Sequence, residues 1–327
     1  MKRILAELIF VAGVAATVWL ALHLGLRPVG QALSTIGVGG VLVVALAHLP
    51  TLVVLGLAWG MLAREARGAE LAKYVWGRLM RDAGGEMLPL SQVGGLAIGA
   101  RALSLAGVPG VEATVTSLLD LFVEQVAKTP YSIVAVALLL WLVPGTALAG
   151  PALAVLALSV VMLGVVALRR DWVRARLVRL AANFDRRRPQ DAGRAEAAMA
   201  EALAPRGRIG FSLALHLAAW ALGAVETWIA LRLLGVDAGL AEGAVIDGLF
   251  VTVRMFAFAI PAAVGVQEGA YVVLCGLFGI GAPTALAFSL VRRARDLVIG
   301  APAVLAWQVL ERRRRADRRT RRTTCEG

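Results

Sequence analysis

Long apolar segments constrain this chain more than any other feature of its sequence. A helix of about 20 apolar residues crosses the hydrocarbon core of a bilayer, which is about 30 Å thick. Hydrophobic residues make up 59% of the chain and charged residues 17%, whereas soluble domains carry about 25% charged residues. The sequence therefore predicts an all-α fold, a polytopic bundle of membrane-spanning helices. The apolar segments are Ile4–Leu26, Ile36–Ala63, Ala152–Leu168, Ile209–Leu231 and Pro283–Leu310.

The positive charge of the chain is unevenly distributed. The formal net charge is +12, and basic residues concentrate in the N-terminal three residues and in Arg64–Asp82, Arg169–Arg208 and Glu311–Gly327. Because cytoplasmic loops are enriched in Lys and Arg, both termini and the long middle loop are expected to be cytoplasmic. A basic surface on that side is expected to attract anionic lipid headgroups. No nucleic-acid-binding motif accompanies the charge, so nucleic acid is not an expected partner.

The charge distribution also divides the chain into parts. Residues 1–168 form a first membrane half and residues 209–310 a second, with a basic cytoplasmic loop at 169–208 between them and a basic cytoplasmic tail at 311–327. The first apolar segment is interpreted as a retained helix, because it is longer than the apolar core of a signal peptide.

Each half contains an apolar segment too rich in Gly and Pro for a straight helix, at about 83–107 and 244–281. Basic loops on one side of the membrane are separated by an even number of crossings. The first segment is therefore predicted to be a re-entrant hairpin from the cytoplasmic side, and the second a hairpin from the external side. Paired broken segments of this kind are typical of inverted repeats with a binding site near the midplane.

The two broken segments are alike in detail. Arg81 lies eight residues before Pro89, and Arg254 lies seven residues before Pro261. Each Pro is followed by Val-Gly and by two glycines four residues apart, which are Gly95 and Gly99 in the first segment and Gly265 and Gly269 in the second. An internal duplication explains this likeness. So does the general need of membrane hairpins for Pro at the turn and Gly where backbones touch.

The same residues indicate a family. The first segment reads Leu88-Pro89-x-x-Gln92-Val93-Gly94-Gly95 with Gly99-Ala100-Arg101, and the second reads Ile260-Pro261 with Val264-Gly265-Val266-Gln267-Glu268-Gly269-Ala270. In these motifs, and over nearly its whole length, the chain resembles the flippase-like lysylphosphatidylglycerol synthase transmembrane family. Within that family it is most similar to hopanoid-biosynthesis-associated membrane proteins of bacteria. The resemblance implies a multi-pass protein of the bacterial plasma (inner) membrane with a lipid substrate.

The chain also departs from the family pattern. Leu96 stands where such proteins often carry an acidic residue after the double glycine, so that carboxylate role is not transferred. The aminoacyl-transferase domain of the larger members has no counterpart in this sequence. Lysyl transfer is therefore not expected.

Charged and polar residues inside the apolar segments are the candidate functional residues. A charge at mid-bilayer costs at least about 2.5–3.5 kcal/mol, so it has to face a partner, a cavity or water. The substrate-binding candidates are Arg81, Glu86, Gln92, Arg101, Arg254, Gln267, Glu268, Arg292, Arg293 and Arg295. The ion-coupling candidates are Asp120, Glu124 and Asp296. No metal site and no cofactor is expected. Four of the candidates, Arg81, Arg101, Arg254 and Glu268, are expected to converge near the midplane.

Asp120 and Glu124 allow two interpretations. They lie four residues apart, on one face of a helix, and two close carboxylates repel unless a cation or a proton lies between them. Either they bind a proton or a coupling ion, or they pair with Arg81, Arg101 or Arg254.

The three arginines of the last apolar segment outnumber Asp296. Their excess charge requires an anionic lipid headgroup or additional carboxylates, unless the helix starts later and the cluster lies near an interface. If the partner is a headgroup, replacing one arginine impairs lipid movement more than folding.

Two glutamates near the predicted hairpin tips have structural alternatives as well. Glu268 either faces a substrate or pairs with Arg254, and Glu86 either faces a substrate or pairs with Arg78 or Arg81. The three histidines, at positions 23, 48 and 216, are expected to form hydrogen bonds between helices rather than to bind a ligand.

The leading functional hypothesis is a transporter that moves a polar-headed lipid, hopanoid- or phospholipid-related, between leaflets. No Walker motif is present, so ATP is not expected to drive it directly. One alternative is a non-catalytic scaffold of a lipid-biosynthetic complex, assembled through the basic loop. Another is a membrane lipid-modifying transferase. No motif for a catalytic metal or a Ser-His pair accompanies the candidate carboxylates, so the chain is not expected to be an enzyme.

Overall fold

The computed structural model describes residues 25–63, 66–87, 91–184, 191–256 and 263–325, with six isolated residues before position 25. These residues form eleven helices and no strand. The predicted all-α fold is confirmed.

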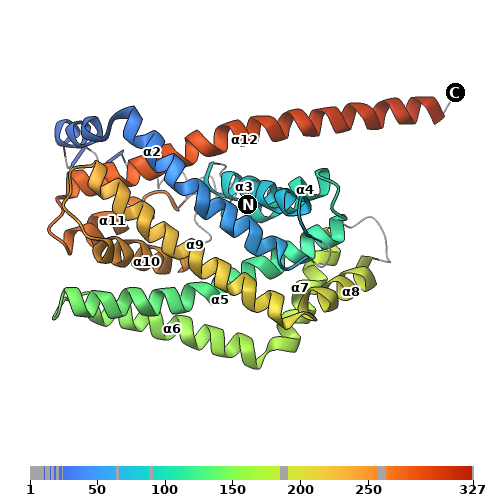
Figure 1. Cartoon of the computed structure of the whole chain (residues 1–327), viewed down its shortest axis with the longest axis horizontal. Coiled ribbons are helices and arrows are strands. Elements are labelled where there is room, and N and C mark those ends of the chain that lie inside the picture. Colours follow the sequence, from blue (N-terminus) through green and yellow to red (C-terminus); the bar gives the residue numbers. More distant parts are fainter. Residues whose placement is uncertain are drawn as a thin grey trace.

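The helices are labelled as in Figure 1. In chain order they are α2 (Leu26–Gly60), α3 (Glu70–Met87), α4 (Ser91–Leu105), α5 (Gly110–Leu142), α6 (Ala149–Leu168), α7 (Arg170–Phe184), α8 (Asp191–Leu203), α9 (Arg206–Leu233), α10 (Leu240–Phe256), α11 (Val266–Gly276) and α12 (Ala282–Cys325). The predicted first helix, over 4–26, lies almost entirely outside the described residues.

Four helices of the described part, α2, α5, α6 and α9, are long and apolar enough to cross a membrane. Three of them, α2, α6 and α9, coincide with predicted apolar segments, and α5 adds a fourth span, which confirms a polytopic helical membrane protein. The helix α2 is longer than the predicted span because it contains two helical pieces that meet at Gly37, whose φ of 57° is non-helical. The predicted start at Ile36 coincides with this break.

The last helix begins at Ala282 and continues without interruption through Pro302 to Cys325. Its start agrees with the prediction of a helix from Pro283, so a later start is excluded and the three arginines lie well inside the helix. The C-terminal part of α12 continues beyond the rest of the bundle (Figure 1). The predicted tail is therefore a helical extension of the last membrane segment.

The helices α3 and α4 form the first hairpin, and glycines permit their close contact. A Cβ on Gly95 would lie 2.8 Å from the backbone nitrogen of Gly85, and one on Gly99 would lie 3.0 Å from the carbonyl oxygen of Gly77. A Cβ essentially never lies within 3.0 Å of a backbone atom, so the seam requires glycine at position 95 and leaves almost no room for a side chain at position 99. The hairpin begins at Glu70, earlier than the predicted boundary at residue 83.

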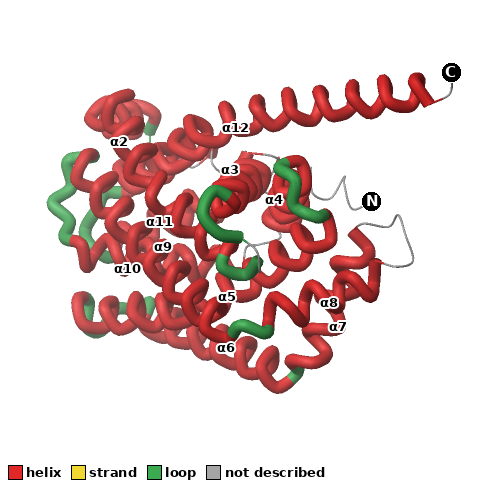
Figure 2. Tube along the Cα trace, turned by 45° about the vertical axis from the view of Figure 1, so that its right-hand side comes forward, coloured by secondary structure: helices red, strands yellow, loops and turns green. Residues whose placement is uncertain are grey.

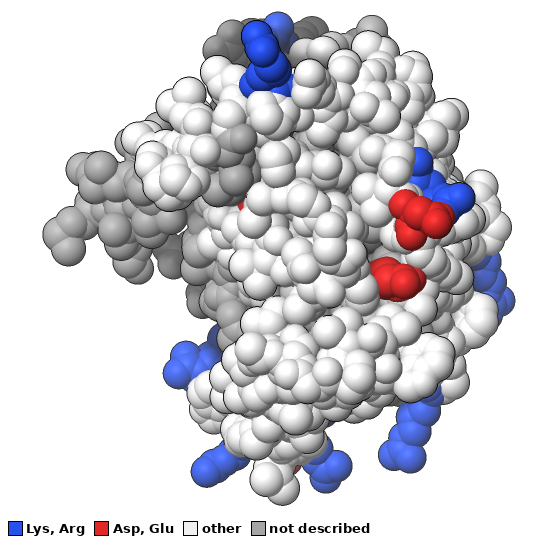
Figure 3. All heavy atoms as spheres, turned by 90° about the vertical axis from the view of Figure 1, so that its left-hand side faces the viewer, with Lys and Arg blue, Asp and Glu red and all other residues white. Residues whose placement is uncertain are grey.

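The two hairpins occupy different parts of the bundle (Figures 1 and 2). The helices α7 and α8 and the last turns of α12 lie towards one end, near α3 and α4, whereas α10 and α11 lie towards the other. The face at that other end is largely free of charged residues (Figure 3). This arrangement agrees with hairpins that enter from opposite faces, and their membrane sidedness stays a prediction.

Candidate functional site: a cavity lined by carboxylates

A cavity lies between α2, α3 and α12. It is small, with a volume of about 20 Å³, which is room for about one water molecule, and it is partly open to the outside. Four of its nine lining residues carry titratable side chains. The lining consists of His48 and Leu52 from α2, Leu79, Asp82, Ala83 and Glu86 from α3, and Asp296, Ile299 and Gly300 from α12.

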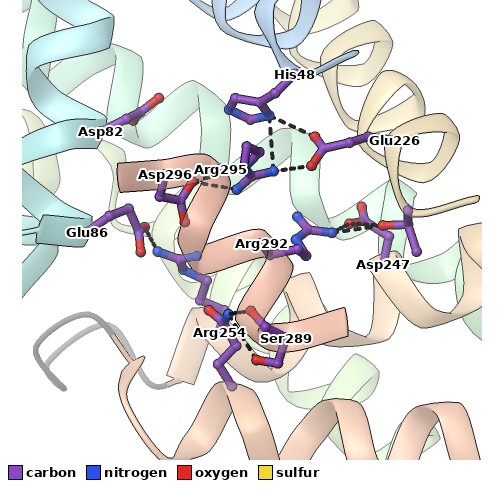
Figure 4. Close-up of polar contacts among 12 residues, drawn as sticks. His48, Asp82, Glu86, Glu226, Asp247, Arg254, Ser289, Arg292, Arg295 and Asp296 are labelled. Carbon is purple, nitrogen blue, oxygen red and sulfur yellow. Dashed lines mark hydrogen bonds and ion pairs between the residues drawn. The ribbon is translucent and has the colours of Figure 1, made fainter. Parts of the chain in front are cut away.

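The three carboxylates at the cavity keep contact with water. The side chains of Glu86, Asp296 and Asp82 are 15%, 19% and 27% exposed. Glu86 pairs with Arg254 near the end of α10, so this ion pair joins the two hairpins (Figure 4). A partly hydrated carboxylate beside an open cavity is able to accept hydrogen bonds from a ligand at a lower desolvation cost than a dry one.

Arg295 connects the cavity to the dry interior. Its guanidinium donates to Asp296 Oδ1, with Nε at 3.0 Å and Nη2 at 2.6 Å, and it also pairs with Glu226 of α9. Glu226 is 1% exposed, and its Oε2 lies 2.7 Å from Nδ1 of His48. The predicted helix-to-helix hydrogen bond of His48 is therefore confirmed. It lies between α2 and α9 (Figure 4).

Arg292 points to a different partner (Figure 4). Its Nη1 donates to Asp247 Oδ1 at 2.9 Å and to Thr227 Oγ1 at 2.8 Å. The hydroxyl of Tyr131 donates to the other oxygen of Asp247 at 3.0 Å. Aromatic faces complete the surroundings of the guanidinium, a favourable arrangement for a cation in a dry site. The rings within 6.0 Å belong to Phe250, Tyr271 and Phe288.

Arg293 holds the start of α11. Its guanidinium pairs with Glu268, whose Oε2 also accepts a hydrogen bond from the backbone nitrogen of Gly265 at 2.7 Å. The neighbouring Gln267 donates from Nε2 to Ser289 Oγ at 3.2 Å. Arg292, Arg293 and Arg295 thus each pair with a carboxylate on another helix. Of the two sources of negative charge considered above, the structure provides the carboxylates.

A second ion-pair network joins α3 to α5. Arg81 donates to Asp120 Oδ2 at 2.6 Å and to Glu124 Oε2 at 2.8 Å. Arg78 donates to the same oxygen of Glu124 at 2.9 Å, and Lys128 Nζ lies 3.2 Å from the other. Of the three predicted partners of the two carboxylates, Arg81 is found. A network of this kind stabilises the fold chiefly because separating any one pair would strand a buried charge.

The four residues expected to converge do not form one cluster. Arg81 contacts the carboxylates of α5, Arg254 contacts Glu86, and Arg101 donates to both oxygens of Glu311 at 2.9 and 3.0 Å. Glu268 forms its ion pair with Arg293, as described above. The side chain of Gln92 lies outside the described residues.

Two cavity residues, His48 and Asp82, were not among the predicted substrate-binding or ion-coupling residues. A signal for Asp82 is present in the sequence: Arg78, Asp82 and Glu86 are spaced by four, which places them on one face of a helix. This spacing did not lead to a site prediction, because residues 64–82 were interpreted as a basic cytoplasmic segment. No comparable signal distinguishes His48 from the other histidines.

One group of side chains in the described part of the chain has the composition of a metal site. Ligand atoms of Asp120, Glu124 and His216 lie within 4.8 Å of one another, and all three residues are buried. The sequence did not predict this group, because the residues come from two helices that are distant along the chain.

The comparison with protein families fits this architecture. Residues 4–303 match the family model of the lysylphosphatidylglycerol synthase TM region. The chain belongs to the lysylphosphatidylglycerol synthase TM region family. The matched residues contain both hairpins, the cavity and both ion-pair networks. Membership in this family indicates a membrane function connected with lipids. Searches of curated proteins and of solved structures found no match.

Proposed function

We propose that this member of the family binds the headgroup of a polar-headed lipid in the carboxylate-lined cavity and moves the lipid between leaflets. The observation that carries the proposal is the cavity itself, where three partly hydrated carboxylates and His48 face one open space. Ionisable residues within a membrane protein are costly, and they usually line a path for a substrate or an ion. The wall of the cavity comes from both halves of the chain, as transport by relative movement of two halves requires.

The lining favours a particular headgroup chemistry. Asp82, Glu86 and Asp296 present carboxylate oxygens, which accept hydrogen bonds and attract positive charge. Arg292, Arg293 and Arg295 of α12 are already paired. A headgroup with amine or hydroxyl donors therefore fits this cavity better than a purely anionic one. A hopanoid-related lipid with a hydroxylated or amino headgroup remains within this class.

The proposal assigns a binding and transport role, without catalysis. Each functional side chain at the cavity is engaged by an ion pair or a hydrogen bond that orients it towards the open space. We propose that these pairs exchange with headgroup contacts during transport. Glu86 and Arg254 are the pair placed best for this exchange, because they join the two hairpins at the edge of the cavity.

Reconstituted liposomes with a fluorescent lipid confined to one leaflet test the proposal. The variants Glu86→Gln and Asp296→Asn are expected to slow lipid movement by about tenfold or more, because hydrogen bonds to charged groups contribute about 1.5–3 kcal/mol each. Asp237→Asn is the control, because Asp237 is 96% exposed and pairs with Arg232 away from the cavity. A folded wild-type protein that moves none of a panel of amine- and hydroxyl-bearing lipids would refute the proposal.

A further inference from the structure

Asp120 and His216 face each other in the interior of the protein, between two of the helices that are able to span a membrane. Asp120 Oδ1 and His216 Nε2 are 3.4 Å apart, and both residues are 0% exposed. Neither atom has a hydrogen-bond partner in the described structure. Buried polar atoms normally have one, so this contact requires an explanation.

The tautomer of His216 makes the contact unfavourable without an additional ligand. The Nδ1 atom lies 2.9 Å from the backbone carbonyl oxygen of Ser212, which is able only to accept, so Nδ1 carries a hydrogen. In a neutral ring, Nε2 then has a lone pair. The carboxylate of Asp120 presents another lone pair to it. Two acceptors in contact without water repel each other, and a proton or a cation between them removes the repulsion.

The charges around the pair favour a proton over a divalent metal. Arg78 and Arg81 from α3 and Lys128 from α5 supply three positive charges. Asp82 from α3 and Asp120 and Glu124 from α5 supply three negative charges. The network is therefore neutral with a neutral His216. A proton raises its charge to +1 and a divalent ion to +2, and uncompensated buried charge is strongly unfavourable.

The third potential metal ligand is also occupied. Glu124 Oε2 accepts hydrogen bonds from Arg78 and Arg81, and Lys128 lies against Oε1. A metal would have to displace these cations. The free atoms at this place are therefore the two that face each other, and they are sufficient to share one proton.

We propose that Asp120 and His216 together bind one exchangeable proton, and that this pair couples proton movement to the lipid transport proposed above, on which the coupling rests. The proton lies either on His216 Nε2 or on the Asp120 carboxyl, and in both places it bridges the same two atoms. The buried hydroxyl of Ser117 has no partner either and lies one turn before Asp120 on α5.

The substitution Asp120→Asn tests the role of the exchangeable proton without disrupting the fold. The amide oxygen is able to accept from Arg81, as the carboxylate does, while the amide nitrogen is able to donate to His216 Nε2. The variant thus reproduces the charge and the hydrogen bonds of the protonated pair, so it is expected to fold. It is unable to release the proton.

Nitrogen NMR of histidine-labelled protein in nanodiscs tests the proton directly. The chain has three histidines, and His23→Gln and His48→Gln assign the signals by elimination. The wild type is expected to show His216 either doubly protonated or with Nε2 as an acceptor beside a protonated Asp120 carboxyl. Infrared spectroscopy detects that carboxyl as a band lost in Asp120→Asn. A neutral His216 beside an ionised Asp120, or a stoichiometric divalent metal that disappears in Asp120→Asn, would overturn the proposal.

Liposome transport tests the coupling. For one proton per lipid, a gradient of one pH unit is expected to shift the steady-state leaflet ratio of labelled lipid by up to about tenfold. In Asp120→Asn the ratio is expected to be unchanged by the gradient. His23→Gln, which removes an exposed histidine, is expected to respond like the wild type.

The outcomes separate the two proposals. If lipid transport by the wild type does not respond to the pH gradient, the proposed coupling is refuted and the proposed function stands. A folded wild type that moves no lipid overturns the proposed function and the coupling with it, whereas the proton on the pair is still decided by NMR.

Discussion

Replacement of Arg295 by methionine is the perturbation that most directly tests the ion-pair architecture. Arg295 is 6% exposed and Glu226 is 1% exposed. The substitution keeps an apolar stem of similar length and removes the guanidinium. Glu226 is then left with His48 as its remaining hydrogen-bond partner. Asp296 lies at the cavity and keeps its contact with water.

The expected cost follows from this burial. Removing one partner of a buried ion pair destabilises a protein by about 3–5 kcal/mol, because it leaves an uncompensated charge. The double variant Arg295→Met with Glu226→Gln removes both charges, and it is expected to recover most of the loss. For comparison, Arg232→Gln breaks a pair whose partner Asp237 is 96% exposed, and it is expected to cost about 0–1 kcal/mol.

Thermal melting in detergent, followed by the fraction of protein that remains monodisperse, measures all three variants. Arg295→Met is expected to melt several degrees below the wild type, and its loss of lipid transport should parallel the loss of folded protein. The reasoning would be refuted if Arg295→Met were as stable as Arg232→Gln, or if the double variant were no more stable than the single one. Loss of transport by a fully folded Arg295→Met would instead restore the headgroup role suggested by the sequence.

Three further predictions concern the hairpins and the topology. Gly95→Ala inserts a Cβ 2.8 Å from a backbone nitrogen and is expected to destabilise by about 1–3 kcal/mol, whereas Gly164→Ala, with open space around it on α6, should be neutral or slightly stabilising by melting temperature. Exchange of the charges in Glu86→Arg with Arg254→Glu should restore transport lost in either single variant; a double variant no better than the singles would contradict a direct pair. A cysteine introduced in place of Arg194 should react with impermeant maleimide only from the cytoplasmic side, and labelling of intact cells would reverse the proposed orientation.

Much of the architecture was predictable because it depends on local properties of the chain. Apolar length determines which segments are able to span a membrane, so α6 and α9 were located to within about three residues at each end, whereas α2 begins ten residues before its predicted start at Ile36. The glycines at 95 and 99 also indicated a close backbone contact, and the α3–α4 seam confirms it. Both inferences require only neighbours in the sequence.

The pairing of charges was less predictable because it depends on contacts between distant helices. The excess of arginine in the last helix was visible, but Asp247 and Glu226 lie 45 and 69 residues away from their partners. Periodicity places a side chain on a face of its own helix and does not specify which helix packs there. Most of the candidate residues therefore form ion pairs, whereas the expected convergence of Arg81, Arg101, Arg254 and Glu268 was not found.

The ion pairs differ in their exposure to water, and the less exposed a pair is, the more free energy its separation costs. The carboxylates of Glu226 and Asp120 have almost no exposure, so separating them from their partners would strand a buried charge. The side chains of Glu86 and Arg254 are 15% and 27% exposed, so water would solvate both charges if the pair separated. Among the ion pairs at the cavity, Glu86–Arg254 therefore costs the least free energy to separate, and a change of shape that starts there opens or closes the space where a headgroup would lie.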